Sequence, residues 1–174
     1  MKNTVKNVAI NGVGIALFVV LSLCLQVPVF ENYYLCLGYV AMTVFCYSIG
    51  TMSGTFVGTI GVILYCLLIS GLRGMPGWAA GNLVLGIVMG ITFKLTKKLN
   101  KPVLEFIISA VAIVAGTAIA MLVIKSGIES FLYSQPFMIR AAKNIYAFVA
   151  DAFVIIFSIP ICRFLEPKIK KILK

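Results

Sequence analysis

Six apolar segments, each close to the length that a helix needs to cross a lipid bilayer, follow one another along this chain of 174 residues. A hydrocarbon core of about 30 Å requires about 20 apolar residues in a helix. Only 11% of the residues are charged, whereas about a quarter are charged in a soluble domain. The sequence therefore predicts an all-α integral membrane protein in which residues 1–174 form a single membrane domain. The helices of this six-transmembrane-helix bundle are predicted at approximately residues 8–26, 34–49, 52–70, 77–95, 103–124 and 142–162.

The second and third segments are separated only by Ser48-Ile49-Gly50-Thr51. Two arrangements satisfy so short a connection. Either the two helices form a very tight hairpin, or one member of the pair is a short helix.

The basic residues are distributed unevenly between the two sides of the membrane. With the N-terminus in the cytoplasm, eleven of the fifteen Lys and Arg residues lie in cytoplasmic segments, which is the usual bias of membrane proteins. Both termini are therefore predicted to be cytoplasmic, in a multi-pass protein of the bacterial plasma membrane. The net charge of +10 then reflects attraction to anionic lipid headgroups and does not indicate nucleic-acid binding. The basic tail EPKIKKILK is either a juxtamembrane anchor or a docking segment for a partner.

The residue types on which most enzymes and metal sites depend are scarce. The sequence has no His, which is the commonest metal ligand and a frequent general base. Its five Cys residues are odd in number and show no CxxC spacing, so we interpret them as small apolar packing residues. No nucleophile–base set and no phosphate-binding loop is recognisable. The chain is therefore predicted to be neither an enzyme nor a cofactor-binding protein.

The fourth segment, which includes GWAAGNLVLGIVMG at residues 77–90, contains residues that a purely lipid-facing helix does not need. Trp78 and Asn82 are four residues apart and share one helix face, which Gly86 and Gly90 continue. An indole and an amide at the outer end of this face offer a stacking surface and hydrogen-bonding groups to a small molecule. We therefore expect Trp78 and Asn82 to bind a ligand.

Other polar and aromatic residues are expected at the same outer side of the membrane. They come from the first outer loop VPVFENYYL, from the loop before the fourth helix, and from the outer end of the sixth helix. The tyrosines are equally compatible with an interfacial aromatic belt. Together with Trp78 and Asn82, these residues predict a pocket. The candidate ligand-binding residues from these segments are Glu31, Asn32, Tyr34, Arg73, Arg140, Lys143 and Asn144.

Asp151 is the only Asp in the sequence and lies seven residues after Asn144, on the same face of the sixth segment. A charged carboxylate at the centre of a membrane helix costs about 2.5–3.5 kcal/mol on insertion scales, so Asp151 should face the bundle interior and have a partner. Two roles are open for it. Asp151 is either a buried polar clamp that holds the sixth helix or a substrate-binding residue.

Small residues form flat faces on the first and third segments. Gly12 and Ala16 are a small-xxx-small pair, which allows another helix to approach closely. That helix belongs either to this bundle or to a separate partner subunit. The third segment carries Gly50, Gly54, Gly58 and Gly61, and we expect them to pack inside the bundle.

The order of these features resembles the substrate-binding (S) components of energy-coupling factor (ECF) vitamin transporters, over nearly the whole chain. The similar features are the Gly12–Ala16 pair, the segment YYLCLGY and the glycine-punctuated stretch SIGTMSGTFVGTIG. They continue with the W-x-x-x-N and G-x-x-x-G pattern from Trp78 to Gly90, and with a sixth helix that contains an Asn before a short basic tail.

The resemblance implies a membrane-embedded subunit that captures a vitamin or a related small heterocycle outside the cell. It implies that Gly12 and Ala16 dock on a transmembrane coupling subunit, and that the first outer loop forms a lid over a pocket lined by helices four to six. Two cytoplasmic ATPases attached to the coupling subunit would supply the energy for uptake. The S component would topple in the membrane and carry its pocket to the cytoplasm.

Two positions depart from the family pattern and leave the ligand open. Many relatives have an acidic residue where this chain has Tyr39, and an Asp near the end of the third helix, where it has Tyr65-Cys66. An aromatic pocket with few charges favours a flat, mostly neutral heterocycle, such as riboflavin or another vitamin precursor. The alternative functions are a stand-alone secondary transporter, which would normally show inverted repeats, and a membrane scaffold or assembly protein.

Overall fold

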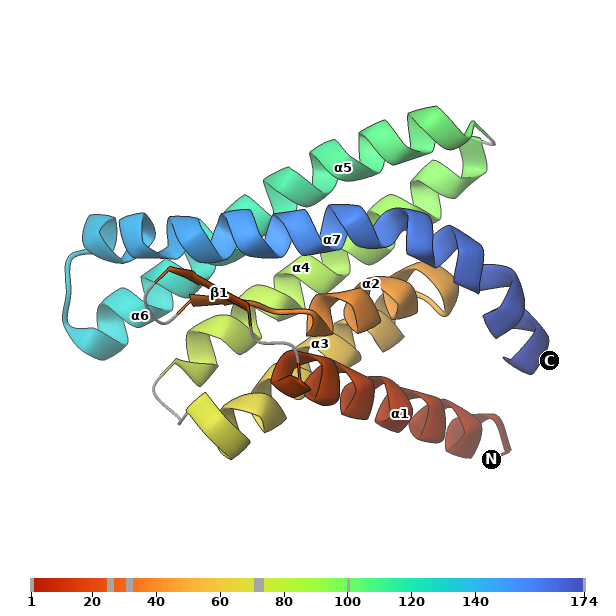
Figure 1. The fold of residues 1–174 in the computed structure, drawn as a ribbon, viewed down its shortest axis with the longest axis horizontal. Coiled ribbons are helices and arrows are strands. Elements are labelled where there is room, and N and C mark those ends of the chain that lie inside the picture. The colour runs from red at the N-terminus through yellow and green to blue at the C-terminus, as the bar shows by residue number, and fades with distance from the viewer. Residues whose placement is uncertain (1, 25–26, 31–32, 71–73, 100, 174) are drawn as a thin grey trace.

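The computed structural model describes residues 2–24, 27–30, 33–70, 74–99 and 101–173. In these residues the chain forms a bundle of helices with one small β-hairpin, and its two ends lie at the same end of the bundle (Figure 1). In chain order the elements are α1 (Lys2–Cys24), β1 (Val27–Phe30), β2 (Tyr33–Leu35), α2 (Gly38–Ser48), α3 (Thr51–Tyr65), η1 (Cys66–Ser70), α4 (Met75–Thr96), η2 (Lys97–Leu99), α5 (Pro102–Ala118), η3 (Ile119–Lys125), α6 (Ser126–Tyr133) and α7 (Phe137–Leu173).

Five helical runs in the described residues are long and apolar enough to cross a membrane. The remaining helix of the predicted six, α2, has only 11 residues, which corresponds to a length of about 16 Å. The second and third predicted segments are therefore a helix pair with one short member, which was one of the two arrangements expected. The prediction of an all-α membrane bundle of six helices is confirmed. The five membrane-length runs are Val5–Cys24, Thr51–Ile69, Met75–Leu99, Pro102–Tyr133 and Phe137–Ile172.

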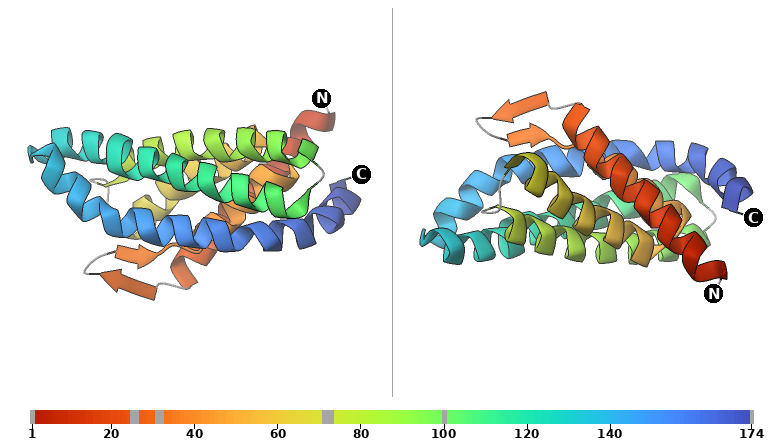
Figure 2. Two further views of the ribbon diagram at one scale, coloured as in Figure 1. Left: turned by 90° about the horizontal axis from the view of Figure 1, so that it is seen from above. Right: turned by 90° about the horizontal axis from the view of Figure 1, so that it is seen from below.

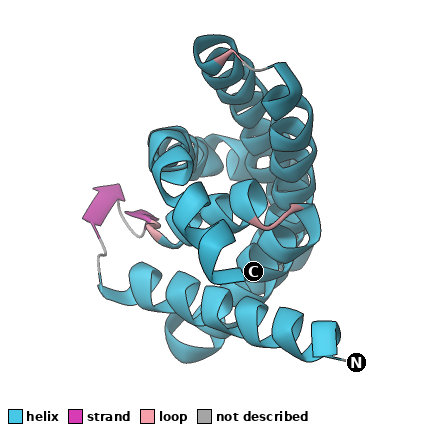
Figure 3. Cartoon of the chain, turned by 90° about the vertical axis from the view of Figure 1, so that its right-hand side faces the viewer, coloured by secondary structure: helices cyan, strands magenta, loops and turns pink. Residues whose placement is uncertain are grey.

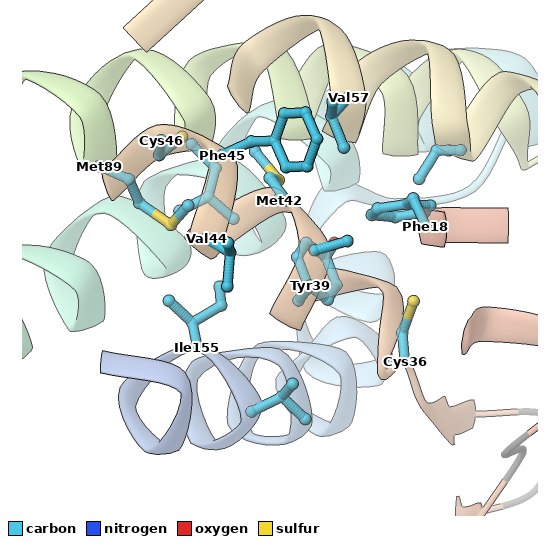
Figure 4. Packing of buried hydrophobic residues seen from close by; sticks show 14 of the residues in the cluster. Phe18, Cys36, Tyr39, Met42, Val44, Phe45, Cys46, Val57, Met89 and Ile155 are labelled. Atoms are coloured by element: carbon cyan, nitrogen blue, oxygen red, sulfur yellow. The ribbon is translucent and has the colours of Figure 1, made fainter. Parts of the chain in front are cut away.

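The short helix α2 lies at the centre of the bundle, where it contacts α1, α3, α4 and α7. Nine of its eleven residues are buried. Its side chains meet Phe18 of α1, Val57 of α3, Met89 of α4 and Ile155 of α7 (Figure 4). A helix that is surrounded by protein in this way must be apolar all round, which explains why hydropathy alone does not distinguish α2 from a membrane-spanning helix.

The remaining elements are arranged around this centre. Helix α1 crosses the bundle obliquely (Figure 2). The hairpin β1–β2 lies at the side of the helices, where it contacts α7 (Figure 3).

The hairpin corrects the predicted start of the second helix. Residues Tyr33–Leu35 were expected to begin a helix at position 34, but they form β2, in which Tyr34 lies opposite Pro28 and Leu35 opposite Val27. Valine, phenylalanine and tyrosine are common in strands. Their apolar character extended the hydropathy signal of α2 in the N-terminal direction.

The last two predicted helices were too short. Helices α5 and α6 are joined through the π-helical turn η3 into one run from Pro102 to Tyr133, and α7 continues into the basic tail. The charged pair Lys125 and Glu129 was expected beyond the end of a helix. Both side chains are instead buried, with Lys125 Nζ 4.0 Å from the Glu129 carboxylate, so the helix continues through them.

Glycines hold α3 close to its neighbours, as expected for internal packing. A Cβ atom added to Gly54 would lie 2.6 Å from the backbone nitrogen of Cys46 in α2. Cβ atoms added to Gly86 and Gly90 of α4 would lie 2.7 Å and 2.5 Å from the Cα atoms of Thr55 and Thr51 in α3. The part of the α4 face formed by Gly86 and Gly90 therefore contacts α3.

We expect Gly54→Ala to lower the free energy of unfolding by about 1–3 kcal/mol, because the added methyl group overpacks a contact with backbone that cannot move aside alone. Gly12→Ala is the matched control, since a Cβ atom there has nothing within 4 Å. Thermal unfolding followed by far-UV circular dichroism in detergent measures the difference. Equal midpoints for the two variants would contradict the close α2–α3 packing.

Candidate functional site

A cavity of about 460 Å³ opens at the end of the bundle opposite the termini. Cavities of about 300–1,000 Å³ are typical of sites for small molecules. The predicted pocket at the outer end of the bundle therefore has a counterpart in the structure. Its walls come from α1, β2, the connection between β2 and α2, the ends of α3 and η1, the start of α4, the η3–α6 region and α7. The residues that line it are Ser22, Tyr34, Leu35, Cys36, Tyr65, Cys66, Ile69, Gly74, Trp78, Lys125, Glu129, Ala147 and Asp151.

Three aromatic side chains from three different elements line this cavity: Tyr34, Tyr65 and Trp78. Tyr65 and Trp78 meet edge to face, with ring centroids 5.6 Å apart and an interplanar angle of 81°. Tyr34 is 43% exposed, so its ring lies at the open side of the cavity. Aromatic side chains that line a cavity can stack on a flat ring.

A chain of hydrogen bonds anchors Trp78 from behind. Its indole Nε1 donates to the Tyr39 hydroxyl at 2.8 Å, and this hydroxyl donates to Asn82 Oδ1 at 2.7 Å. Asn82 Nδ2 in turn donates to the carbonyl oxygen of Gly58 at 3.0 Å. The chain links α4 to α2 and α3, and it fixes the orientation of the indole.

Asn82, whose amide was expected to contact a ligand, is not among the residues that line the described cavity. Its side chain is fully buried below Trp78, and both its oxygen and its nitrogen have protein partners. A buried amide without hydrogen-bond partners would destabilise the fold. The structure therefore places Asn82 as a support for Tyr39 and Trp78.

The charged groups of the cavity are Lys125, Glu129 and Asp151. Lys125 Nζ lies 5.7 Å from the centre of the Trp78 ring and 4.0 Å from the Glu129 carboxylate. Asp151 is 4% exposed and lies beside the Tyr39 hydroxyl. Asp151 therefore has a polar partner inside the bundle, as a clamp requires, and also lies on the cavity wall, as a substrate-binding residue requires.

Asn144 lies one layer behind this wall. It is fully buried, and its Nδ2 donates to Ser126 Oγ at 2.9 Å and to Glu129 Oε2 at 3.0 Å. Asn144 and Asp151 share a face of α7 with Ala147, which lines the cavity. Asn144 therefore orients Glu129 and is not part of the wall itself.

Two other candidates on α7, Arg140 and Lys143, are not among the residues that line the described cavity. Lys143 is exposed, because it is turned by about 100° from Asn144 on the helix. Arg140 places its guanidinium carbon 3.9 Å above the centre of the Tyr133 ring. The candidates Glu31, Asn32 and Arg73 lie outside the described residues.

Sequence reasoning did not select Tyr65, Lys125 or Glu129 for the site. Lys125 and Glu129 are four residues apart, a spacing that brings two side chains together on a helix. That signal was present in the sequence. The spacing did not lead to a predicted contact between Lys125 and Glu129, because the fifth helix was expected to end at residue 124.

The two residues predicted to dock on a partner lie on the outside of α1. Gly12 and Ala16 are both exposed, and a Cβ atom at Gly12 would meet nothing within 4 Å. In contrast, Gly14 on the same helix faces Phe45 and Val57 of the core.

A membrane bundle with an aromatic, partly charged cavity at one end is typical of membrane-embedded proteins that bind small molecules. Residues 2–166 match the model of a family described as "ECF-type riboflavin transporter, S component". The chain belongs to this family, as the order of its motifs suggested. It is a vitamin-binding S component of an ECF transporter and not an enzyme.

A solved structure agrees with this assignment at the level of the fold. The chain is similar to the S-component for biotin from an ECF-type ABC transporter, with a TM-score of 0.65 and 18% sequence identity. The similarity covers 95% of this chain and 93% of the other.

Proposed function

We propose that this chain binds riboflavin in the cavity between α4, α7 and the β-hairpin, and delivers it to partner subunits for ATP-driven uptake. The observation that carries the proposal is the aromatic cavity wall of Tyr34, Tyr65 and Trp78 in a volume of about 460 Å³. Riboflavin consists of a flat three-ring system and a polyhydroxyl chain, and so combines a stacking surface with hydrogen-bonding groups. The family to which the chain belongs is described as the S component of an ECF-type riboflavin transporter.

The charges of the cavity support a ligand without a carboxylate. Lys125 is the single cation on the described wall, against the two carboxylates of Glu129 and Asp151. In its charged state the wall therefore carries one negative charge in excess. Like charges in a buried site repel strongly, so a neutral flavin fits this wall better than an anionic vitamin such as biotin.

The proposed partners are a transmembrane coupling subunit and, through it, two cytoplasmic ATPases. The exposed pair Gly12 and Ala16 on α1 supports a helix-docking site for the coupling subunit. Ligand capture and energy supply would then reside in different chains.

Fluorescence of the only Trp in the chain tests the ligand directly. Trp78 lines the cavity, so bound riboflavin is expected to quench its emission saturably at one ligand per protein. Biotin at the same concentration is expected to leave the emission unchanged. A free tryptophan derivative in the same solutions corrects for light absorbed by riboflavin. Unsaturable quenching equal to that of the free derivative, or quenching by biotin alone, would refute riboflavin as the ligand.

A further inference from the structure

The hydrogen bonds around the Tyr39 hydroxyl leave one acceptor on the cavity wall without a donor. Asp151 of α7 lines the cavity, is only 4% exposed, and has the Tyr39 hydroxyl beside it. This hydroxyl has a single proton, which it donates to Asn82 Oδ1 at 2.7 Å, while it accepts from Trp78 Nε1 at 2.8 Å. The Tyr39 hydroxyl therefore has no second proton to donate to the Asp151 carboxylate.

The cation of the wall does not replace this donor. The ion pairs formed within the described residues do not include Asp151, and Lys125 interacts with its charge only from a longer distance. Buried polar atoms are nearly always paired, and a buried carboxylate without a donor is costly. A bound molecule with an N–H or O–H group would supply the donor that Asp151 lacks.

The second carboxylate of the wall, that of Glu129, is engaged by the protein on both of its oxygens. Oε2 accepts from Asn144 Nδ2 at 3.0 Å, and Oε1 lies 4.0 Å from Lys125 Nζ. Glu129 thereby holds the ammonium group of Lys125 at the wall. An ammonium group carries three N–H donors, so Lys125 can donate to a ligand while Glu129 keeps it in place.

The donor Lys125 and the acceptor Asp151 both lie around the indole of Trp78. Lys125 Nζ is 5.7 Å from the centre of the Trp78 ring. Asp151 lies beside the hydroxyl that binds the indole N–H. A flat ring that stacks on an aromatic wall presents its edge to the polar groups around that wall. The edge of such a ligand would therefore meet a donor and an acceptor together.

We infer that Asp151 accepts a hydrogen bond from the imide N–H of the flavin ring, while Lys125 donates to a neighbouring carbonyl oxygen. The inference rests on the proposed function, because it assigns the orientation of riboflavin in the same cavity. The imide N–H of riboflavin, at N3, lies between two carbonyl groups, so a donor and an acceptor on the protein match this edge. Asp151 is then a specificity-determining residue, which favours rings that carry an N–H beside a carbonyl group.

N3-methylriboflavin tests the contact, because it keeps the chromophore and the ribityl chain but lacks the imide N–H. Its dissociation constant for the unmodified protein is expected to be about thirtyfold larger than that of riboflavin, since a hydrogen bond to a charged group is lost. In Asp151→Ala the two flavins are expected to bind within about threefold of each other, since the acceptor is gone and the methyl group has room. Quenching of flavin fluorescence measures both constants.

The matched control is Ser158→Ala, which removes a buried polar group from the same face of α7. Ser158 lies seven residues after Asp151, is 1% exposed and donates to the carbonyl oxygen of Val154. It is not part of the described cavity wall. This variant should therefore keep the thirtyfold preference, whereas a general loosening of α7 would reduce the preference in both variants and contradict the inference.

An equal preference in the unmodified protein and in Asp151→Ala would overturn the inference and leave riboflavin binding itself intact. The inference also fails if Asp151→Ala instead removes the loss of affinity for lumiflavin, which has no ribityl chain, because the carboxylate would then hold that chain. If circular dichroism shows that Asp151→Ala is unfolded, Asp151→Asn decides. Its neutral amide is a weaker acceptor, so an undiminished preference there would refute the contact. Binding of neither flavin by the unmodified protein would refute the proposed function, and the inference with it.

Discussion

Replacing Trp78 with alanine is expected to weaken riboflavin binding about a hundredfold while the bundle stays folded. The indole provides the largest aromatic surface on the cavity wall, it meets Tyr65 edge to face, and it is fixed by the Tyr39 hydroxyl. Truncating a well-anchored tryptophan at a binding site costs about 2–4 kcal/mol, which corresponds to a factor of about 30–900. The fluorescence of riboflavin itself measures binding, because the variant has no tryptophan.

The control for this change is Phe131→Ala, which removes an aromatic ring from the same end of the bundle. Phe131 is 87% exposed and is not part of the described cavity wall, so its removal should leave the dissociation constant unchanged. Trp78→Phe should give an intermediate loss, since it keeps a ring but removes the N–H that donates to Tyr39. Wild-type affinity in Trp78→Ala would show that riboflavin binds elsewhere.

The aromatic end of the α4 face could be recognised from the sequence, but the hydrogen-bond partners of its amide could not. Trp78 and Asn82 share a face by helix geometry, and a tryptophan next to an amide indicates a polar site. The partner of Asn82 is Tyr39, which is 43 residues away in the sequence. Spacing within one helix cannot show whether a buried polar group already has a partner from another helix.

Hydropathy located the membrane segments but not their ends. It measures transfer into an apolar environment, and the interior of a bundle and a lipid bilayer are similar in this respect. The fully packed α2 and the strand β2 therefore merged into one predicted segment. The charged pair Lys125–Glu129 instead made the fifth predicted helix too short. The helix continues through these two residues because their charges are buried together and partner each other.

The glycine faces show which tertiary features a sequence can reveal. Gly54, Gly58 and Gly61 recur on α3 at helical spacing, and each of them meets a side chain of α2 or α1. Gly12 belongs to a similar pattern but meets nothing. The pattern alone predicted close approach in both places, and only the structure separates a face filled by the same chain from one that is empty.

This empty face leads to the second large effect. We expect Gly12→Leu/Ala16→Leu to abolish the complex with the coupling subunit, while riboflavin still binds. Two leucine side chains on a flat helix face would prevent the close backbone approach on which association of membrane helices depends. Both positions are exposed in the isolated chain, so the fold should tolerate them. Co-purification of the coupling subunit with a tagged form of this chain measures the complex, and Trp78 fluorescence measures riboflavin binding.

The matched control is Val111→Leu/Ala115→Leu on α5, which places two leucines at the same spacing on another exposed helix face. This variant should keep the complex, since it changes only a surface that faces lipid. Loss of the complex in both variants would point to a general effect on membrane insertion. Retention in both would exclude α1 as the docking helix. Loss in the α1 variant alone, with riboflavin binding intact, would show that capture of the vitamin and coupling to the energy source use separate faces of this chain.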